Sequence, residues 1–289
     1  MQPIATIPVA NVLGEGVLWD GRTQSVWWTD IEQCRLYRYV WPGGPLKTYV
    51  TPERLGSFGF VSGSSRLVAA FETGFALFDP ETGALDWLWR KVRPGQRLND
   101  GRVDCQGRFW AGSLAERREE KGKAELYCLD GKGQVTTHAR GLTISNGICW
   151  SPDSSRFYLA DSPAKLIWRY GFDPAAGTIS DRQVFAADAG GIPDGSAVDA
   201  GGCLWNASWD TGCVIRYAPD GRLDRRIALP AGRPTCVAFG GPELNLLFVT
   251  SARFELDPEA LQRQPEAGHL FVFLLDVAGL PEHRYRLSR

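Results

Sequence analysis

The sequence predicts an all-β protein, a six-bladed β-propeller whose four-stranded antiparallel blades surround a central channel. The first observation behind this prediction is a turn-closing residue that recurs every 41–48 residues, at Asp20, Ser62, Asp104, Ser151, Asp199 and Gly240. The second is that each repeat holds three short apolar or alternating runs separated by Gly, Asp, Ser or Pro. The third is that long helical periodicity is absent. Strand-rich repeats of this length are typical of propellers, and six repeats predict six blades.

The fourth strand of each blade is expected in the variable linkers between repeats, for example at residues 47–50, 87–90, 134–138 and 181–185. The ring of blades must also be closed, and we expect residues 4–9 to pair with strands near the other end of the chain, around 283–287. One or two helical turns are expected at 257–264. Because the repeats are evenly spread and leave no place for a boundary, residues 1–289 are predicted to form a single domain.

The composition limits the classes of partner. The chain has 44% hydrophobic residues, 22% charged residues and a formal net charge of −1, so nucleic acid and anionic membranes are poor candidates. No apolar run approaches the ~20 residues of a membrane span, and the first residues lack the features of a signal peptide. Seven scattered cysteines without a CxxC pair indicate free thiols in a reducing compartment. We therefore expect a cytoplasmic protein, and a closed propeller of this kind is expected to be a monomer.

A second repeated position lies five residues before each turn-closing residue. It is occupied by Glu15, Ser57, Asn99, Asn146, Asp194 and Thr235. All six side chains carry an oxygen, and the first strand of each propeller blade lines the channel, so these residues should form a ring near one mouth. Asn and Asp before Gly also form turns, which is the structural alternative, but glutamate is a weak turn residue. Four potential metal ligands on one axis therefore favour a metal site.

The ring offers carboxylate and amide oxygens rather than histidine or thiolate. Hard oxygen donors suit Ca²⁺, Mg²⁺ or Mn²⁺; we expect one divalent ion, Ca²⁺ first, with Mn²⁺, Mg²⁺, Zn²⁺ and Fe²⁺ left open. Glu15 and Asp194 would neutralise its charge, and Asn146 would add a neutral donor. Three protein ligands leave positions for water and substrate, as a catalytic site requires. Beside the ring, the guanidinium of Arg97 could bind the oxygens of a ligand, whereas Asp100 is expected to orient the turn or to pair with a neighbour.

Five motifs occur in order along nearly the whole chain: LGEGVLWD (13–20), RLNDGRVDCQGRFWAGSLAE (97–116), SNGICWSPDSSRFYLADSPAKLIWRY (145–170), PDGSAVDAGGCLWNASW (193–209) and PTCVAFGGPELNLLFVTSAR (234–253). Together they resemble the senescence marker protein/gluconolactonase family, which includes regucalcin and bacterial sugar lactonases. The resemblance implies a six-bladed propeller with one catalytic divalent metal that hydrolyses lactones of aldonic acids. It implies that the metal ligands are Glu15 of LGEG, Asn146 of SNG and Asp194 of PDG.

The same resemblance assigns the substrate contacts. Arg97 and Asn99 of RLND correspond to a substrate-binding pair, and Glu116, which ends GSLAE, corresponds to a position that contacts sugar hydroxyls. The expected mechanism is metal-assisted hydrolysis of a small sugar lactone. Asp194 is the candidate general base that takes a proton from the attacking water, and a hydroxide activated by the ion is the alternative. Trp209 could stack on a sugar or simply pack at the rim.

Other readings stay open. The chain could be a non-catalytic propeller that binds a divalent ion, or a metal-dependent phosphotriesterase or other esterase on the same scaffold. A serine hydrolase is disfavoured because no GxSxG-type motif is present. Cys149 and Cys236 are expected to be core thiols, because apolar residues surround them. The sequence does not decide which aldonolactone is preferred.

Overall fold

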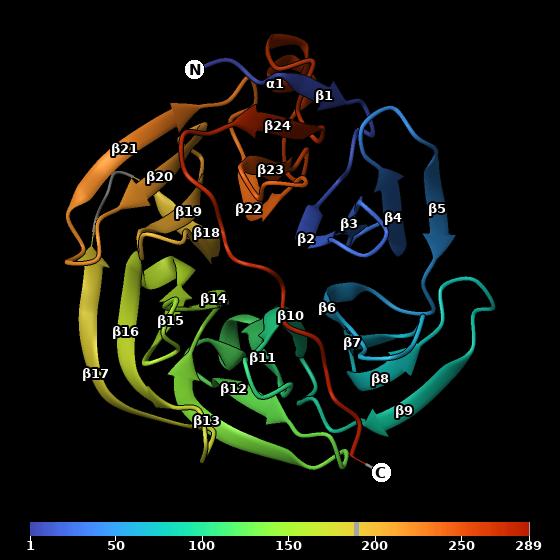
Figure 1. Ribbon diagram of the computed structural model, residues 1–289, viewed down its shortest axis with the longest axis vertical. Helices are drawn as coiled ribbons and strands as arrows, with labels where there is room; N and C mark the ends of the chain where they lie inside the picture. Colours follow the sequence, from blue (N-terminus) through green and yellow to red (C-terminus); the bar gives the residue numbers. More distant parts are fainter. Residues whose placement is uncertain (188–190, 289) are drawn as a thin grey trace.

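The computed structural model describes residues 1–187 and 191–288. Within them the chain forms six four-stranded sheets, arranged radially around a channel as the blades of a propeller (Figure 1). Neighbouring strands within the blades are antiparallel. In five blades the strands follow chain order from the channel outward, so each is a series of consecutive hairpins. The predicted fold class is therefore confirmed.

The first three blades consist of β2 (Gly14–Asp20), β3 (Ser25–Asp30), β4 (Arg35–Val40), β5 (Leu46–Val50), β6 (Leu55–Phe60), β7 (Leu67–Phe71), β8 (Gly74–Phe78), β9 (Leu85–Trp89), β10 (Gln96–Val103), β11 (Phe109–Ala115), β12 (Ala124–Leu129) and β13 (Val135–Leu142). The fourth and fifth consist of β14 (Ser145–Trp150), β15 (Arg156–Asp161), β16 (Leu166–Asp173), β17 (Thr178–Ala187), β18 (Ile192–Val198), β19 (Leu204–Trp209), β20 (Cys213–Tyr217) and β21 (Leu223–Ala228). The sixth contains β22 (Pro234–Gly240), β23 (Leu246–Ser251), β24 (Leu270–Leu274) and β1 (Ala5–Ile7). The outer strands β5, β9, β13 and β17 lie in the linkers, as predicted.

The sixth blade closes the ring. Its outermost strand is β1, which pairs antiparallel with β24, so residues 4–9 do close the ring against the far end of the chain. The predicted partner around 283–287 is wrong, because the apolar run of β24 supplies the neighbouring strand. The last residues instead cross the channel in projection (Figure 1). Tyr285 is fully buried, forms a bridge with Val61, and donates its hydroxyl to the Asp130 carbonyl at 2.6 Å.

Short helical segments interrupt the connections between strands. The helix α1 (Pro258–Arg263) lies between β23 and β24, where one or two helical turns were predicted. Its N-cap is Asp257, whose carboxylate accepts a hydrogen bond from the Ala260 amide at 2.7 Å. Two 3₁₀ turns, η1 (Arg118–Glu120) and η2 (Ser162–Ala164), follow β11 and β15. No helix in the described part of the chain is long and apolar enough to cross a membrane.

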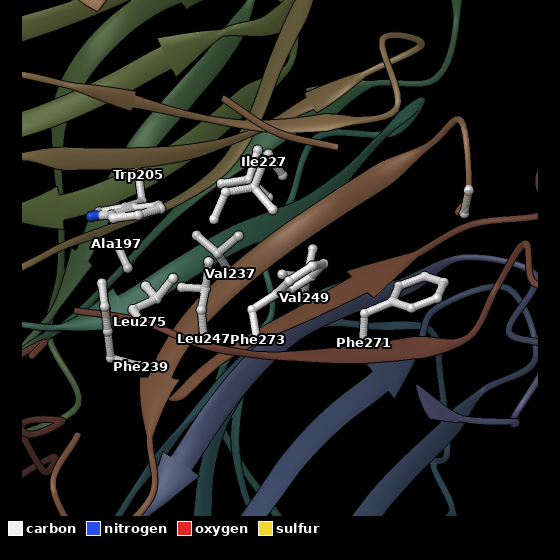
Figure 2. Close-up of a cluster of buried hydrophobic side chains, with 13 residues drawn as sticks. Ala197, Trp205, Ile227, Val237, Phe239, Leu247, Val249, Phe271, Phe273 and Leu275 are labelled. Atoms are coloured by element: carbon white, nitrogen blue, oxygen red, sulfur yellow. The ribbon is translucent and has the colours of Figure 1, made fainter. Parts of the chain in front are cut away.

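Apolar side chains fill the space between neighbouring blades. Figure 2 shows the cluster between blades five and six, in which Trp205 and Ile227 of one sheet face Val237, Val249 and Phe271 of the other. Burying a side chain of this kind contributes roughly 1.5–3 kcal/mol relative to leaving it exposed. Because every blade packs on two neighbours in this way, the ring holds its innermost strands in fixed positions around the channel.

Two of the turn-closing residues have a further structural role. The carboxylates of Asp104 and Asp199 are fully buried and accept hydrogen bonds from the indole N–H groups of Trp110 and Trp205, each at 2.9 Å. Arg108 and Arg216 pair with the same carboxylates. The repeated Asp therefore joins the end of an innermost strand to the strand beside it.

The cysteines are free thiols in the structure. Cys149 and Cys236 are each 2% exposed, as expected for core thiols. Burial raises the pKa of both thiols, so they stay protonated and unreactive at neutral pH.

Candidate metal centre and active site

The ring positions owe their orientation to β-bulges. In each of the six innermost strands, the pairing with the second strand shifts register at this position. A bulge interrupts the ladder and re-aims a side chain, and bulges are frequent next to active sites. Gly16 and Gly147 follow Glu15 and Asn146 with φ of 57° and 66°, a conformation that glycine adopts without steric cost. The Gly that follows each of these two ring residues is thus required by the bulge.

The four potential ligands meet at one mouth of the channel. Glu15, Asn99, Asn146 and Asp194 line a single pocket of about 380 Å³. Their side chains come from blades one, three, four and five, and each residue is between 5% and 7% exposed. The convergence predicted from the repeat is therefore present.

The two remaining ring positions brace the backbone around the pocket. Ser57 donates its hydroxyl to the Asn99 carbonyl at 2.7 Å. Thr235 donates its hydroxyl to the carbonyl of Gly14, the residue before Glu15. Neither side chain is among those that line the pocket in the described part of the chain, so their oxygens hold the neighbouring inner strands together.

Glu15 and Asp194 form a carboxyl pair. The two groups are within hydrogen-bonding reach of each other, and both are buried. Burial, and next the nearby charge of Asp100, raises the pKa of Glu15 to about 8. Burial and the charge of Glu15 raise the pKa of Asp194 well above its usual range. Two carboxyl groups in such a place retain a proton between them unless a cation neutralises both charges.

The donor set fits a divalent cation. Asp194 Oδ1 is buried and has no hydrogen-bond partner in the parts of the chain that the structure describes. A buried oxygen in this state costs free energy, and a cation coordinated by it would remove that cost. Among the described residues no three His, Cys, Asp or Glu side chains gather closely enough to hold a metal ion. The amide oxygen of Asn146 is therefore needed beside Glu15 and Asp194, giving the oxygen ligands that Ca²⁺ prefers.

The side-chain amides at the site are held in one orientation. Asn99 Nδ2 donates to Asn146 Oδ1 at 2.7 Å and to the Ser145 carbonyl at 2.9 Å. Arg97 Nη1 donates to Asn99 Oδ1 at 2.7 Å and to the Leu98 carbonyl at 3.0 Å. The predicted residues Arg97, Asn99 and Asn146 thus form one hydrogen-bonded row across blades three and four.

Glu116 lies apart from the other predicted site residues. Its side chain is 32% exposed and does not line the pocket within the described residues. Its carboxylate is 2.7 Å from Arg54 Nη1 and 3.9 Å from Arg97 Nε. Arg54 also pairs with Glu72 at 2.9 Å. Glu116 therefore belongs to a charged network at the rim. Its closer partner is Arg54, and its contact with Arg97 is a longer ion pair.

Above the polar floor the pocket has an apolar wall, which sequence reasoning missed. It consists of Leu13, Leu114, Ile144, Pro163, Ile192, Trp209 and Phe254. Trp209 packs among Leu13, Ile31 and Ala252, and the Arg233 guanidinium lies 5.0 Å from its ring centroid. Trp209 is thus both a packed rim residue and part of the pocket lining. Leu13, Ile144 and Ile192 each lie two positions before a ring residue, and Leu114 and Trp209 each lie fifteen positions after one. This repeat is the signal in the sequence that could have located most of the wall.

Three carboxylates hold the strands that carry the ligands. Asp30 accepts from the amides of Val12 and Leu13 at 2.8 and 3.1 Å, just before Glu15. Asp161 accepts from Thr143 and Ile144 in the equivalent place before Asn146. Asp100 accepts from the Ile148 amide at 2.8 Å, which holds the bulge of β14. The expectation that Asp100 orients a turn or pairs with a neighbour is confirmed.

The three histidines lie away from this pocket. His138 packs on Trp110 with ring centroids 4.5 Å apart, the ring of His269 faces the amide of Ala10, and His283 lines a cavity that includes Arg102 and Glu282. Among the described residues that line the pocket, the ionisable proton acceptors are therefore carboxylates.

The chain matches the family model described as SMP-30/Gluconolactonase/LRE-like region over residues 13–253. It is 37% identical over 276 residues to a 6-deoxy-6-sulfogluconolactonase of Pseudomonas putida, with 94% of each chain covered. It is also 37% identical over 283 residues to an L-arabinolactonase of Azospirillum brasilense, covering 95% of this chain and 92% of that one. The crystal structure of regucalcin from Agrobacterium tumefaciens, described as a calcium-binding protein, superimposes with a TM-score of 0.93 at 33% identity over 99% of both chains. The chain belongs to the SMP-30/gluconolactonase/LRE-like family.

Proposed function

We propose that this protein is a hydrolase of carboxylic ester bonds that opens a sugar lactone, the internal ester of an aldonic acid, with the help of one divalent cation. The observation that carries the proposal is the buried, unpartnered Oδ1 of Asp194 beside the carboxyl group of Glu15, on the floor of a pocket. The lactonases to which the chain is 37% identical support the same chemistry.

Glu15, Asn146 and Asp194 would hold the cation. A bound divalent ion supplies Lewis-acid polarisation of the lactone carbonyl, an effect that can be worth several kcal/mol in the transition state. Calcium is the first candidate, because oxygen donors suit it and the regucalcin structure is described as calcium-binding.

The polar residues beside the ligands orient the substrate. Arg97 is 6% exposed, and burial lowers its pKa to about 10, so it stays charged at neutral pH. Its guanidinium and the amide of Asn99 face the pocket, where they can bind ring hydroxyls. Glu116 would act at the rim, through hydroxyls distant from the carbonyl or through Arg97. The apolar wall excludes bulk water from the part of the lactone ring that the polar residues do not contact.

Asp194 accepts the proton from the attacking water. The water oxygen forms a bond to the lactone carbonyl carbon, and its proton moves to the Asp194 carboxylate. The bond from that carbon to the ring oxygen then breaks, and the proton passes to the ring oxygen, which leaves as a hydroxyl of the open acid. The departing group stays attached to the product, so no separate strong acid such as histidine is needed.

A pH-stat assay tests the proposal, because each ring opened releases one acid equivalent. The panel contains the lactones of gluconic, xylonic, arabinonic and galactonic acids, a phosphotriester and an aryl ester, each with and without EDTA. We expect turnover of one or more aldonolactones that EDTA abolishes and Ca²⁺ or Mn²⁺ restores. Turnover of the phosphotriester or aryl ester alone, cation binding without any turnover, or turnover that survives exhaustive chelation would each contradict the proposal.

A further inference from the structure

Ser162 is a buried hydroxyl between two of the proposed cation ligands. It opens η2 directly after β15, is 4% exposed, and lines the pocket. Its oxygen lies 2.8 Å from Asn146 Nδ2 and 2.7 Å from the carbonyl oxygen of Pro193, the residue before Asp194. One side chain outside the ring therefore contacts the ligand-bearing strands of blades four and five.

The direction of these two bonds is determined by chemistry. A carbonyl oxygen can only accept, so the single hydrogen of the Ser162 hydroxyl goes to Pro193. The hydroxyl oxygen can then only accept from Asn146, which requires that the nitrogen of the Asn146 amide point at Ser162. Its oxygen must point the other way, where it accepts from Asn99.

This orientation matters because an asparagine amide has two ends of similar shape and opposite polarity. With the oxygen turned toward the site it can coordinate a cation, whereas after a flip it would present N–H groups and repel one. On the other side, Asn99 is itself fixed by Arg97 and by the Ser145 carbonyl. The hydrogen bonds therefore run in one direction along the row, each residue donating to the next: Arg97, Asn99, Asn146, Ser162 and the Pro193 carbonyl. Ser162 is the partner that fixes the orientation of the Asn146 amide.

We propose that Ser162 is a positioning residue that orients the Asn146 amide oxygen toward the cation and holds the Asp194 strand in register with it. The inference rests on the proposed cation site. Outer partners of this kind are worth about 10–100-fold in metal affinity.

The test measures calcium affinity by chelator competition, with the melting temperature of the metal-free protein measured in parallel. Ser162→Ala is expected to weaken Ca²⁺ binding by about tenfold or more, and Ser162→Thr, which keeps the hydroxyl, is expected to restore most of it. The matched control is Ser251→Ala. That serine is also buried and donates to a backbone carbonyl at 2.7 Å, that of His269, but within the described residues no hydrogen bond joins its hydroxyl to a proposed ligand. It should lower the melting temperature by a similar amount and leave the calcium affinity unchanged.

A double mutant separates orientation from general loosening. Aspartate at position 146 has two equivalent oxygens, so its function as a ligand does not depend on which way the side chain is turned. Adding Ser162→Ala to Asn146→Asp should therefore change the Ca²⁺ affinity by less than about threefold. The role of Ser162 would be overturned if Ser162→Ala left the Ca²⁺ affinity unchanged. It would also be overturned if Ser162→Ala weakened Ca²⁺ binding equally in the wild-type and the Asn146→Asp backgrounds. In either case cation binding and turnover by the wild-type protein would leave the proposed function intact, whereas a wild-type protein that binds no divalent cation would contradict both.

Discussion

The carboxyl groups of Glu15 and Asp194 lie within hydrogen-bonding reach of each other at the channel mouth, although they come from the first and the fifth blades. Burial raises the pKa of both groups; the charge of Asp100 raises the pKa of Glu15 further, and the charge of Glu15 raises the pKa of Asp194 further. The fold thus places two acids where they are costly to ionise, and this cost is what a bound cation would remove.

The first prediction concerns pH. A carboxyl group whose folded pKa lies above its unfolded value binds more protons in the native state, so the free energy of unfolding falls as pH rises. In EDTA, stability should therefore decrease from about pH 4.5 through about pH 8, the usual and the folded pKa of Glu15. Denaturant unfolding at a series of pH values measures this slope.

Two comparisons check the cause of the slope. Saturating Ca²⁺ should flatten it, because cation binding displaces the shared proton. Glu15→Gln should make the slope shallower in EDTA as well, leaving the part that Asp194 contributes, while Glu32→Gln at the rim, where Glu32 lies 3.5 Å from Arg54, should leave the slope unchanged. A slope that is the same in Glu15→Gln as in the wild type would contradict the assignment.

The second prediction concerns substrate binding by Arg97. Its Nη1 atom is occupied by Asn99 and by the Leu98 carbonyl, which leaves the rest of a planar fork for substrate. Arg97→Lys keeps the charge and loses the fork, so KM for an aldonolactone should rise by about tenfold, with a smaller change in kcat. Steady-state kinetics give both values. A fall in kcat with unchanged KM would show that Arg97 does not act in substrate binding.

The third prediction concerns charge on the substrate. Within the described residues Arg97 is the one cation that lines the pocket, and Glu255 lines it as well. Arg54 and Arg233, at the rim, pair with Glu116 and Asp210, each at 2.7 Å. An anionic substituent such as a sulfonate at C6 would therefore find no cation in the pocket other than Arg97, which we assign to the ring hydroxyls, and would be repelled by Glu255. Neutral aldonolactones should be hydrolysed with at least tenfold higher kcat/KM than 6-deoxy-6-sulfogluconolactone.

Glu255→Lys tests the same idea from the protein side. The substitution should reduce the ratio of kcat/KM between neutral and anionic lactones, and this effect should become smaller as the salt concentration is raised. If wild-type protein prefers the sulfonated lactone, the electrostatic argument is wrong.

The fourth prediction concerns the C-terminal tail. Tyr285 is fully buried, in a cluster with Phe109 and Tyr127, so Tyr285→Ala should lower the free energy of unfolding by about 3–5 kcal/mol. Tyr285→Phe loses only the hydrogen bond to Asp130 and should cost about 1 kcal/mol. Chemical denaturation compares the three proteins. Equal stability of Tyr285→Ala and wild type would show that the tail is not part of the folded core.

The fold and the ring could be predicted because both repeat. An oxygen-bearing side chain five positions before a turn recurs in every blade, and closure of the ring brings these positions together whatever the details of packing. The partner of β1 could not be predicted in the same way. The segment 283–287 alternates like a strand, yet it contributes a single buried aromatic residue, Tyr285, and forms a bridge with Val61 rather than a ladder.

The rest of the site depends on residues outside the six ring positions. Ser162 follows β15 rather than an innermost strand, and wall residues such as Ile144 and Phe254 lie in different connections. Their relation to Asn146 and Asp194 arises only when blades four, five and six are packed together. Glu116 is the opposite case. A sequence motif predicts it as a site residue, but its carboxylate pairs with Arg54 at the rim.

The most direct test of the central claim is calcium titration of the EDTA-treated protein by calorimetry, together with Glu15→Gln and Asp194→Asn. The account predicts one bound ion per chain in the wild type, and an affinity weakened by at least about a hundredfold in both variants while they remain folded. Binding of no divalent ion by the wild type, or undiminished binding by either folded variant, would contradict it.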